Sequence, residues 1–243
     1  IHAPPLEKFG IAELRRMVVI SVVLAWSIAA SALRWVVRRR HRTVVRAAAD
    51  GMVDGFEILG PTFVKLGQLI ASSPSIFPEP LSEACVRCLD EVRPFPPEVV
   101  RQLITEQLGR PPGQIFARFD DTPLSAASIA QVHACTLPDG REAVVKLQRP
   151  DIAHRMNTDL RIQYFFARHL QKRSKAAQRA NVVAMVVDLH EVTNQELNAA
   201  LEAHRQTRFR EHIGDFGDNA NITAPEVYWN YCGPNLICME RMS

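Results

Sequence analysis

The hydrophobic pattern divides the chain into an apolar N-terminal stretch, a series of helical segments and one β-rich hairpin. The longest apolar run, residues 17–33, predicts a helix. Apolar residues also recur at helical spacing over 44–59 and 98–108. The run 61–70 begins with a proline, which favours the first helical turn. With a further helix expected at about 81–91, the chain up to residue 112 is predicted to be helical.

A β-hairpin is predicted next. Small residues from Ser125 to Ala130 open a β-branched stretch, and Pro138-Asp139-Gly140 then turns the chain into a second apolar strand. Asp-Gly between two such runs indicates a hairpin, because glycine tolerates the positive φ of tight turns.

Helices follow the hairpin. The pattern predicts one helix over 151–172, a polar break at 173–180 and one long helix over 182–212. Two strands, 226–231 and 236–242, are predicted at the end of the chain.

Composition and charge narrow the class of protein. With 243 residues and 47% hydrophobic content, the chain can bury a substantial core and has room for one large or two modest domains. The net charge is only +3, but residues 1–46 hold nine Lys or Arg against two Glu. This basic head predicts contact with an anionic surface near the N-terminus. No nucleic-acid-binding motif accompanies it, so nucleic acid is not an expected partner.

The apolar run has three interpretations: a membrane-embedded or interfacial helix, a buried core helix and a partner-binding helix. Seventeen residues span roughly 25 Å, the short limit for a hydrocarbon core of about 30 Å, and extension through Val37 adds a single arginine that could snorkel. Trp26 and Trp35 suit interfacial depth. The arginine cluster at 38–42 argues against a cleaved signal peptide and is expected to stay on the cytoplasmic side. Membrane association is the leading expectation.

The five cysteines do not predict a disulfide framework in a chain of this length, and a reducing setting is the simpler interpretation. Cys85 and Cys88 have redox or metal spacing, but no second pair or nearby histidine completes a zinc set. We interpret them as a structural pair on a helix, and we expect no metal site in this stretch.

Lys146 is the main chemical candidate. A lysine inside an apolar strand, preceded by small residues that let backbone N–H groups approach an anion, suggests a phosphate cradle. The alternative is a surface hairpin with Lys146 in solvent. Glu196 and Glu202 on the long helix either form a charge set with Lys146 or are solvated. Lys65 and Gln68, three residues apart, share a helix face.

The order of these motifs resembles the UbiB family of atypical protein-kinase-like proteins, the group that includes the mitochondrial ADCK proteins of coenzyme Q metabolism. The resemblance covers about residues 40–243. It rests on Lys65-Leu66-Gly67-Gln68 (the KxGQ motif), Ser125–His133 (the alanine-rich loop), Ala143-Val144-Val145-Lys146 (the nucleotide-lysine strand), Glu196-Leu197-Asn198 with Glu202-Ala203 (the ExD helix), and Leu236–Glu240 (the strand entering the hinge).

The fold implied by this resemblance is α+β. A kinase-like N-lobe, made of an antiparallel sheet and a long αC-type helix, would occupy residues 113–243 and end at the hinge. A helical KxGQ extension over 44–112 and a basic apolar helix over 1–43 would precede it.

The resemblance also assigns roles near the phosphates. Lys146 would contact the α- and β-phosphates of ATP and pair with Glu202. The backbone of the alanine-rich loop would line the phosphates, at Ala126, Ala127 and Ser128.

Further roles concern the rest of the site. Lys65 and Gln68 would lie over it, with Lys65 pairing to the Glu196 region, which would block the path of a peptide substrate. Glu240 and Met242 would flank the adenine.

The implied function is an ATPase, or a transferase acting as a small-molecule or lipid kinase, that supports isoprenoid-quinone or lipid metabolism at a membrane. The implied partners are ATP, a lipid or isoprenoid-quinone precursor, the membrane surface and proteins of a biosynthetic complex. The catalytic loop and the Mg²⁺ ligands would follow Ser243, so this stretch alone is not expected to turn over ATP.

One departure from the family pattern favours an alternative. The ExD motif ends in Asn198, which puts any role of its second carboxylate in doubt. The alternative function is a non-catalytic nucleotide- or lipid-sensing scaffold that assembles partners.

Overall fold

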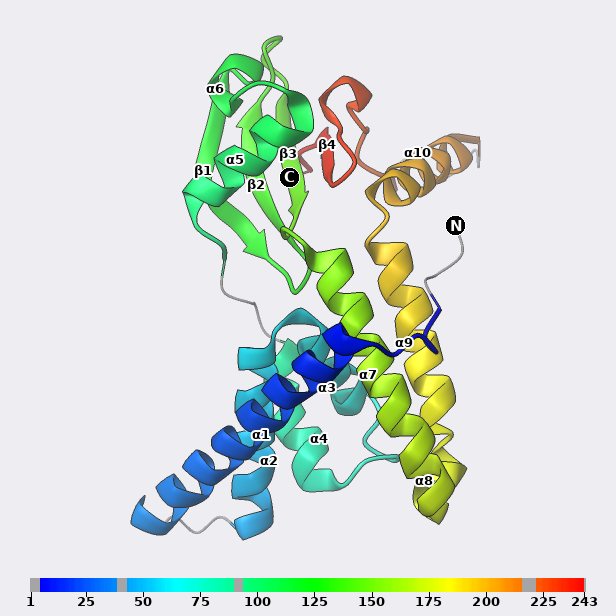
Figure 1. Cartoon of the computed structure of the whole chain (residues 1–243). Helices are drawn as coiled ribbons and strands as arrows, with labels where there is room; N and C mark the ends of the chain where they lie inside the picture. The colour runs from blue at the N-terminus through cyan, green and yellow to red at the C-terminus, as the bar shows by residue number, and fades with distance from the viewer. Residues whose placement is uncertain (1–4, 39–42, 90–93, 216–221, 243) are drawn as a thin grey trace. The chain divides into compact units, whose positions relative to one another are not determined.

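The computed structural model describes residues 5–38, 43–89, 94–215 and 222–242. The chain forms two compact units (Figure 1), each built from two separate stretches of sequence. The first unit comprises Ile1–Glu91 and Ala153–Glu191, and the second comprises Val92–Ile152 and Val192–Ser243. The three segments expected from the sequence stay a prediction, and most of the basic block at 38–42 lies outside the described residues.

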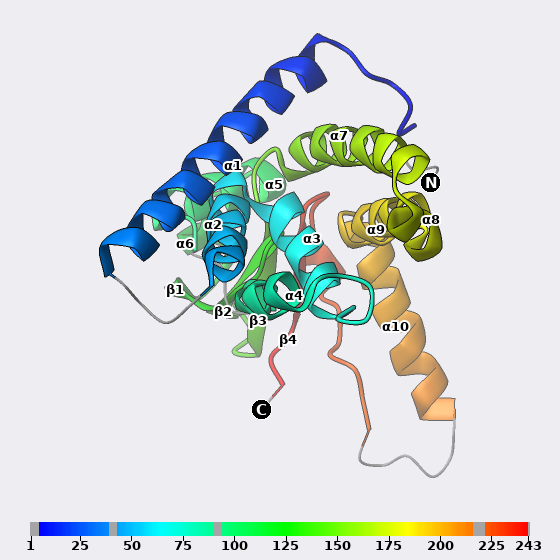
Figure 2. The ribbon, with the colours of Figure 1, turned by 90° about the horizontal axis from the view of Figure 1, so that it is seen from below.

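The first unit opens with two antiparallel helices, α1 (Ile11–Arg38) and α2 (Val44–Leu59), which lie side by side (Figure 2). Glycines on α2 permit this close approach. A Cβ atom at Gly51 would lie 2.7 Å from the Cα of Ile28, and one at Gly55 would lie 2.8 Å from the side chain of Leu24. Without glycines at these positions the two helix backbones could not come so close.

Local sequence signals set the ends of the next helices. The hydroxyl of Thr43 accepts a hydrogen bond from the N–H of Arg46 and caps α2, whose predicted bounds are confirmed. Gly60 ends it at φ 100°, and Pro61 begins α3 (Pro61–Ala71). The helix expected at 81–91 is instead the shorter α4 (Glu79–Cys85), followed by a 3₁₀ turn at Val86–Leu89.

A buried carboxylate ties these helices to α7 (Ile152–Arg173). Asp159 is 1% exposed and accepts hydrogen bonds from the Nε of Arg16 at 2.7 Å and the hydroxyl of Thr62 at 3.1 Å. The carbonyl of Leu59 accepts from both Arg16 and Arg155. Such pairing is required because a buried charge without partners is strongly destabilising. The network fixes the α2–α3 junction.

Two predictions for this region are wrong, and polar capping residues explain both. The expected polar break contains α8 (Lys175–Ala180), which Ser174 caps and Asn181 ends in the left-handed conformation. The expected helix over 182–212 is two helices, α9 (Val182–Glu196) and α10 (Ala199–Asp215). Asn198 caps α10, so the chain breaks there despite the continuous periodicity.

The second unit is built on an antiparallel sheet in the order β1-β2-β3-β4. The hairpin of β2 (Ala130–Thr136) and β3 (Glu142–Gln148) is confirmed, with Gly140 at φ 89° in its turn. β1 (Arg118–Ala126) has no clear alternation of polar and apolar residues, because register shifts around Pro123 interrupt its pairing with β2. It is therefore absent from the hydrophobic pattern.

The last strand is β4 (Leu236–Glu240), which pairs with β3. The strand predicted over 226–231 is wrong. Val227 makes only an isolated bridge to Met239, and a 3₁₀ turn at Trp229–Tyr231 follows. These helices and this antiparallel sheet confirm the predicted α+β class.

The two faces of the sheet differ in burial. On one face Val145 and Leu147 of β3 pack into a core with α5 (Pro97–Leu108), which lies across the strands next to α6 (Pro112–Ile115) (Figure 1). On the other face Val144 and Lys146 are only half-buried, since side chains alternate along a strand. There α10 covers the β4 side, where Ala199 and Ala203 contact Ile237.

A buried histidine links β1, β2 and the segment before α5. The Nδ1 of His133 lies 2.8 Å from the carbonyl of Asp120, and its Nε2 lies 2.7 Å from the amide nitrogen of Gln131. The amide oxygen of Gln131 accepts from the N–H of Phe95. Nε2 must therefore be unprotonated and Nδ1 must donate, which requires a neutral ring. Burial lowers the pKa of His133 accordingly.

We predict that this neutral histidine makes stability depend on pH. The unfolded state takes up a proton near pH 6.5 and the folded state does so only at lower pH. The free energy of unfolding should therefore be greatest above about pH 6.5 and fall below it. His133→Gln should reduce this decline when thermal unfolding is compared at pH 7.5 and 5.5, and an unchanged decline would contradict the assignment. The buried His190, whose pKa is also lowered, should account for the remainder.

We also predict that Gly51→Ala destabilises the first unit although alanine is the better helix former. The new Cβ meets backbone atoms of α1, so the free energy of unfolding should fall by about 1–3 kcal/mol in urea titrations. Gly113→Ala, in helix α6, is the control, because a Cβ there meets nothing within 4 Å and the variant should be at least as stable as the wild type. Equal stability of both variants would refute the close helix contact.

Candidate functional site

The centre of the candidate site is an ion pair between β3 and α10. The Nζ of Lys146 donates to the Oε1 of Glu202 at 2.5 Å, across 56 residues of sequence. The two side chains are 27% and 32% exposed, so the pair is open to solvent on one side and is not fully buried. Lys146 is thus held by a carboxylate and still accessible to a ligand.

Asn198 positions Glu202. Its side-chain oxygen accepts from the N–H of Leu201 at 2.9 Å, and its carbonyl accepts from the N–H of Glu202 at 3.0 Å. These bonds fix the first turn of α10, which carries the carboxylate facing Lys146. The residue that departs from the expected motif therefore has a structural role here, which the sequence alone did not indicate.

Gln148 fastens the adjoining helix end to the same strand. Its side-chain amide donates to the carbonyl of Glu196, the last residue of α9, at 3.3 Å. Because Gln148 and Lys146 lie on the same face of β3, one strand holds both the lysine and the α9–α10 junction.

The alanine-rich loop is held by Arg149, a residue that sequence reasoning missed. Its guanidinium donates to the carbonyl of Ala127 at 3.1 Å, and its N–H donates to the carbonyl of Ile129 at 2.9 Å. Ala126 and Ser128 are buried, and Ala127 is exposed. The position of Arg149 directly after the lysine strand was the available signal. The loop is thus a braced backbone turn beside β3.

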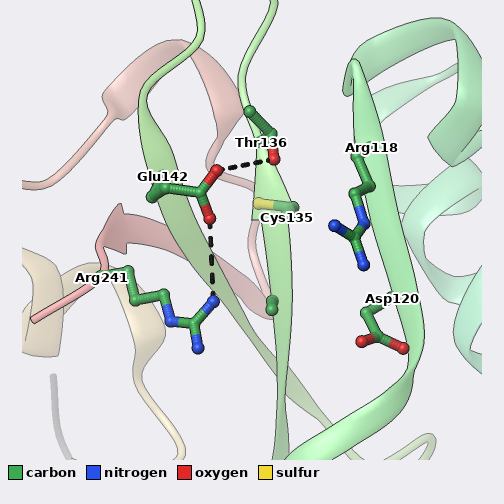
Figure 3. A pocket seen from close by; sticks show the side chains of 7 residues that line it. Arg118, Asp120, Cys135, Thr136, Glu142 and Arg241 are labelled. Atoms are coloured by element: carbon green, nitrogen blue, oxygen red, sulfur yellow. Dashed lines mark hydrogen bonds and ion pairs between the residues drawn. The ribbon is translucent and has the colours of Figure 1, made fainter. Parts of the chain in front are cut away.

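A shallow pocket opens on the lysine-bearing face of the sheet (Figure 3). Its polar walls come from β1, β2, β3 and the end of β4. In it the carboxylate of Glu142 accepts from the hydroxyl of Thr136 at 3.0 Å and lies 3.7 Å from the guanidinium of Arg241. The other residues lining it are Arg118, Asp120, Ala134 and Cys135.

Between this pocket and Lys146 the surface is apolar. Ala134 and Val144 pair directly across β2 and β3, and both are half-buried. Glu142 and Lys146 are four residues apart on one strand, or about 13 Å. This face of the sheet therefore has the polar pocket at Glu142 at one end, the apolar pair Ala134 and Val144 in the middle, and Lys146 at the other end.

The two residues expected near an adenine lie at the end of β4. The carboxylate of Glu240 accepts from Arg210 at 2.9 Å and from the N–H of Glu226 at 3.1 Å. These bonds, chiefly that from Glu226, lower the pKa of Glu240. Its carboxylate is thus engaged in the fold. Met242 is 48% exposed. Their contact with adenine stays a prediction.

The KxGQ residues lie in the first unit, on α3. Lys65 is half-buried, and the side-chain amide of Gln68 donates to the carbonyl of Cys88 at 2.9 Å. A Cβ atom on Gly67 would lie 2.4 Å from the sulfur of Cys88, which explains the glycine. Placement of Lys65 and Gln68 over Lys146, and pairing of Lys65 with the Glu196 region, stay predictions.

Cys85 and Cys88 are both buried and free, as their interpretation as a structural pair requires. In the described part of the chain, no group of three or more His, Cys, Asp or Glu side chains is arranged to hold a metal ion.

Comparison with known proteins identifies clear relatives. The profile of the ABC1 atypical kinase-like domain matches residues 87–243. An uncharacterized protein of Mycobacterium tuberculosis is 36% identical over 218 residues, which is 89% of this chain and 44% of that protein. A probable protein kinase UbiB of Azotobacter vinelandii is 35% identical over 209 residues, 86% of this chain and 38% of that protein. The chain thus spans less than half the length of these relatives.

A solved structure also resembles the chain. The complex of a Mycobacterium tuberculosis protein with erythromycin gives a TM-score of 0.48 at 29% identity, covering 73% of this chain and 44% of the other.

We predict that Asn198 acts as a helix cap. Asn198→Ala should lower the free energy of unfolding by about 1 kcal/mol, because the N–H of Leu201 loses its acceptor. Asn198→Asp should stay within a few tenths of a kcal/mol of the wild type, since aspartate caps equally well. Urea titration of the three proteins measures this. An aspartate variant as unstable as the alanine variant would contradict the capping role.

Proposed function

The chain belongs to the ABC1 atypical kinase-like family, and from this premise we propose that its second unit binds ATP. The observation that carries the proposal is the Lys146–Glu202 ion pair, which holds a partly exposed ammonium on the open face of the sheet. A lysine held in this way by a carboxylate is the arrangement with which kinase-like sites contact the α- and β-phosphates.

The surroundings of Lys146 support a phosphate ligand. In this proposal the backbone at Ala126, Ala127 and Ser128 lines the phosphates, where only small side chains could obstruct an anion, and the N–H of Ala127 itself donates to the carbonyl of Ala130 within the loop. The guanidinium of Arg149 holds that loop in place by donating to the carbonyl of Ala127. A preorganised loop loses little conformational freedom on binding, which favours affinity.

The remainder of the face suits a nucleoside. Ala134 and Val144 form an apolar floor on which a flat base can lie. Beyond it, the polar pocket at Glu142, Thr136 and Arg241 offers hydrogen-bonding groups to a ribose or base edge. In this proposal Glu240 and Met242 flank the adenine, with the carboxylate of Glu240 retained by Arg210.

The proposed activity of the longer protein is that of an ATPase or of a kinase for a small molecule or lipid. We place Lys65 and Gln68 above the nucleotide, with Lys65 paired to the Glu196 region, where they would exclude a peptide. The carboxylate of Glu202 is engaged by Lys146, and the described residues form no metal-binding group. They do not fit a Mg²⁺ site by themselves, so we derive no metal-dependent step from them.

We propose that this activity supports isoprenoid-quinone or related lipid metabolism at a membrane. The expected partners are ATP, a lipid or quinone precursor and proteins of a biosynthetic complex. Among the described residues, one helix, Ile11–Val37, is long and apolar enough to cross a membrane, which is weak evidence of membrane association. The basic residues around it favour attachment on the cytoplasmic side.

One observation favours a second function, a non-catalytic nucleotide- or lipid-sensing scaffold. Asn198 stands where the resembled motif has an aspartate, and it serves as a helix cap. Capping needs no negative charge, so the position can be filled by a residue that controls no metal.

We predict that the chain binds ATP and that Lys146→Met weakens binding at least about tenfold, because charge-assisted contacts to the phosphates are lost. Isothermal titration calorimetry with ATP measures the affinity. Lys175→Met, at an exposed lysine that begins α8, is the matched control and should bind as the wild type does. Equal affinity of the Lys146 and Lys175 variants would refute the site.

A phosphate-release assay on a version of the protein extended past Ser243 distinguishes the two proposed functions. If it is an enzyme, Lys146→Ala should abolish phosphate release from Mg-ATP. If the extended protein binds ATP but releases phosphate equally with and without this substitution, the enzyme proposal fails and the scaffold remains.

A further inference from the structure

The two faces of α1 differ in chemistry and in what they contact. The inner face is buried or half-buried and mixes polar residues (Glu13, Arg16, Ser27 and Ser31) with apolar ones such as Ile20. The outer face is exposed and apolar. A helix designed to cross a bilayer as a single span would be apolar all round, so this division needs another explanation.

The inner face of α1 packs against other elements of the first unit and forms ion pairs with them. Arg16 donates to the buried Asp159 at 2.7 Å, and Glu13 accepts from Arg161 at 2.9 Å. Ser27 and Ser31 lie against the glycines of α2, with the Cβ of Ser31 2.9 Å from where a Cβ at Gly51 would stand. Small residues four apart on both helices therefore bring the two backbones together.

The outer face is an apolar strip along the whole helix. The strip runs from Ile11, 72% exposed, through Trp26, 72% exposed, to Val37, 73% exposed. These residues are separated by about 39 Å along the helix axis. The other large apolar side chains of the strip are Leu14, Val18, Val19, Val22, Leu33 and Val36.

The exposed charged side chains of α1 that the structure describes are basic, and one of them, Arg34, pairs with Asp54 of α2 at 2.5 Å. The only acidic residue of α1 is Glu13, which is 5% exposed on the inner face. Arg15 and Arg34 are exposed, one toward each end of the strip. An apolar strip with basic residues and an exposed tryptophan complements the interface of an anionic phospholipid leaflet.

From these contacts we propose that α1 binds an anionic phospholipid leaflet in the plane of its interface, through the outer face, while the inner face stays packed on α2. This proposal rests on the membrane association proposed above and specifies its geometry. Crossing the bilayer would require α1 to leave α2 and to break the bonds of Arg16 with Asp159 and of Glu13 with Arg161, which would leave the buried Asp159 without its cationic partner. Nor can α2 accompany it, because α2 carries Arg46, Asp50, Asp54 and Glu57.

Trp26 makes the geometry measurable, because it lies near the middle of the strip. A crossing helix would place it near the bilayer centre, whereas a helix in the interface plane would place it about 5–10 Å deep. The full chain with Trp35→Phe and Trp229→Phe retains Trp26 as its single tryptophan. Vesicles of phosphatidylcholine and phosphatidylglycerol, with bromines at acyl positions 6,7 or 11,12, serve as the probe. We expect stronger quenching by the 6,7-bromolipid.

The second measurement is flotation with the same vesicles. Val22→Glu on the outer face should weaken binding at least about tenfold. Leu124→Glu, at an exposed leucine of β1 in the second unit, is the matched control and should float as the wild type does. Vesicles of phosphatidylcholine alone, or high salt, should also weaken binding, because the basic residues then lose their anionic partners. Unchanged melting temperatures would confirm that both variants fold.

The outcomes distinguish the proposals. Binding with stronger quenching by the 11,12-bromolipid would overturn the in-plane geometry and leave membrane association standing. No flotation of the wild type would overturn membrane association itself, without bearing on ATP binding. A dimer in sedimentation experiments that Val22→Glu dissociates, with no vesicle binding, would assign the strip to a second copy of the chain and overturn the proposal.

Discussion

The candidate site in the second unit depends on one interaction, the 2.5 Å ion pair that joins Lys146 of β3 to Glu202 of α10. A lone ammonium on this half-buried face would be unfavourable, and a distant carboxylate would leave it without a fixed direction. The pair meets both requirements, and the packing of Ala199 and Ala203 on Ile237 brings the first turns of α10 to the sheet. Two neighbouring contacts help to position Glu202 for this pair. Asn198 starts the helix, and Gln148 fastens the junction before it.

Partial exposure gives the pair its functional meaning. Exposed ion pairs contribute little to stability, so a pair that is about one-third exposed is poorly explained as a device for holding the fold together. The pair instead fixes the position of the Lys146 ammonium, which lies on the same face of the sheet as the apolar residues Ala134 and Val144. The alanine-rich loop, held by Arg149, adjoins the same strand. The family relationship and this geometry both support the nucleotide site proposed above.

Charges in the first unit are used differently. Asp159 is almost fully buried and receives hydrogen bonds from Arg16 and Thr62, so it acts within the protein. The glycines of α2 complete the attachment of α1. This attachment buries one face of a helix whose apolar composition alone left membrane-embedded, interfacial, core and partner-binding interpretations open, and it leaves the other face exposed.

Local signals in the sequence determined the capped helix ends at Thr43, Gly60 and Pro61, the Asp-Gly hairpin and the identity of Lys146, because each depends on neighbours a few residues away. Tertiary structure decided the rest. β1 escaped notice because its register shifts at Pro123 destroy the alternation, and the break at Asn198 escaped because apolar periodicity continues across it. The residues alone left open whether Glu202 pairs with Lys146 or is solvated, the family resemblance favoured the pair, and Arg149 was missed altogether. Both are contacts between residues distant in sequence, and periodicity carries no information about those.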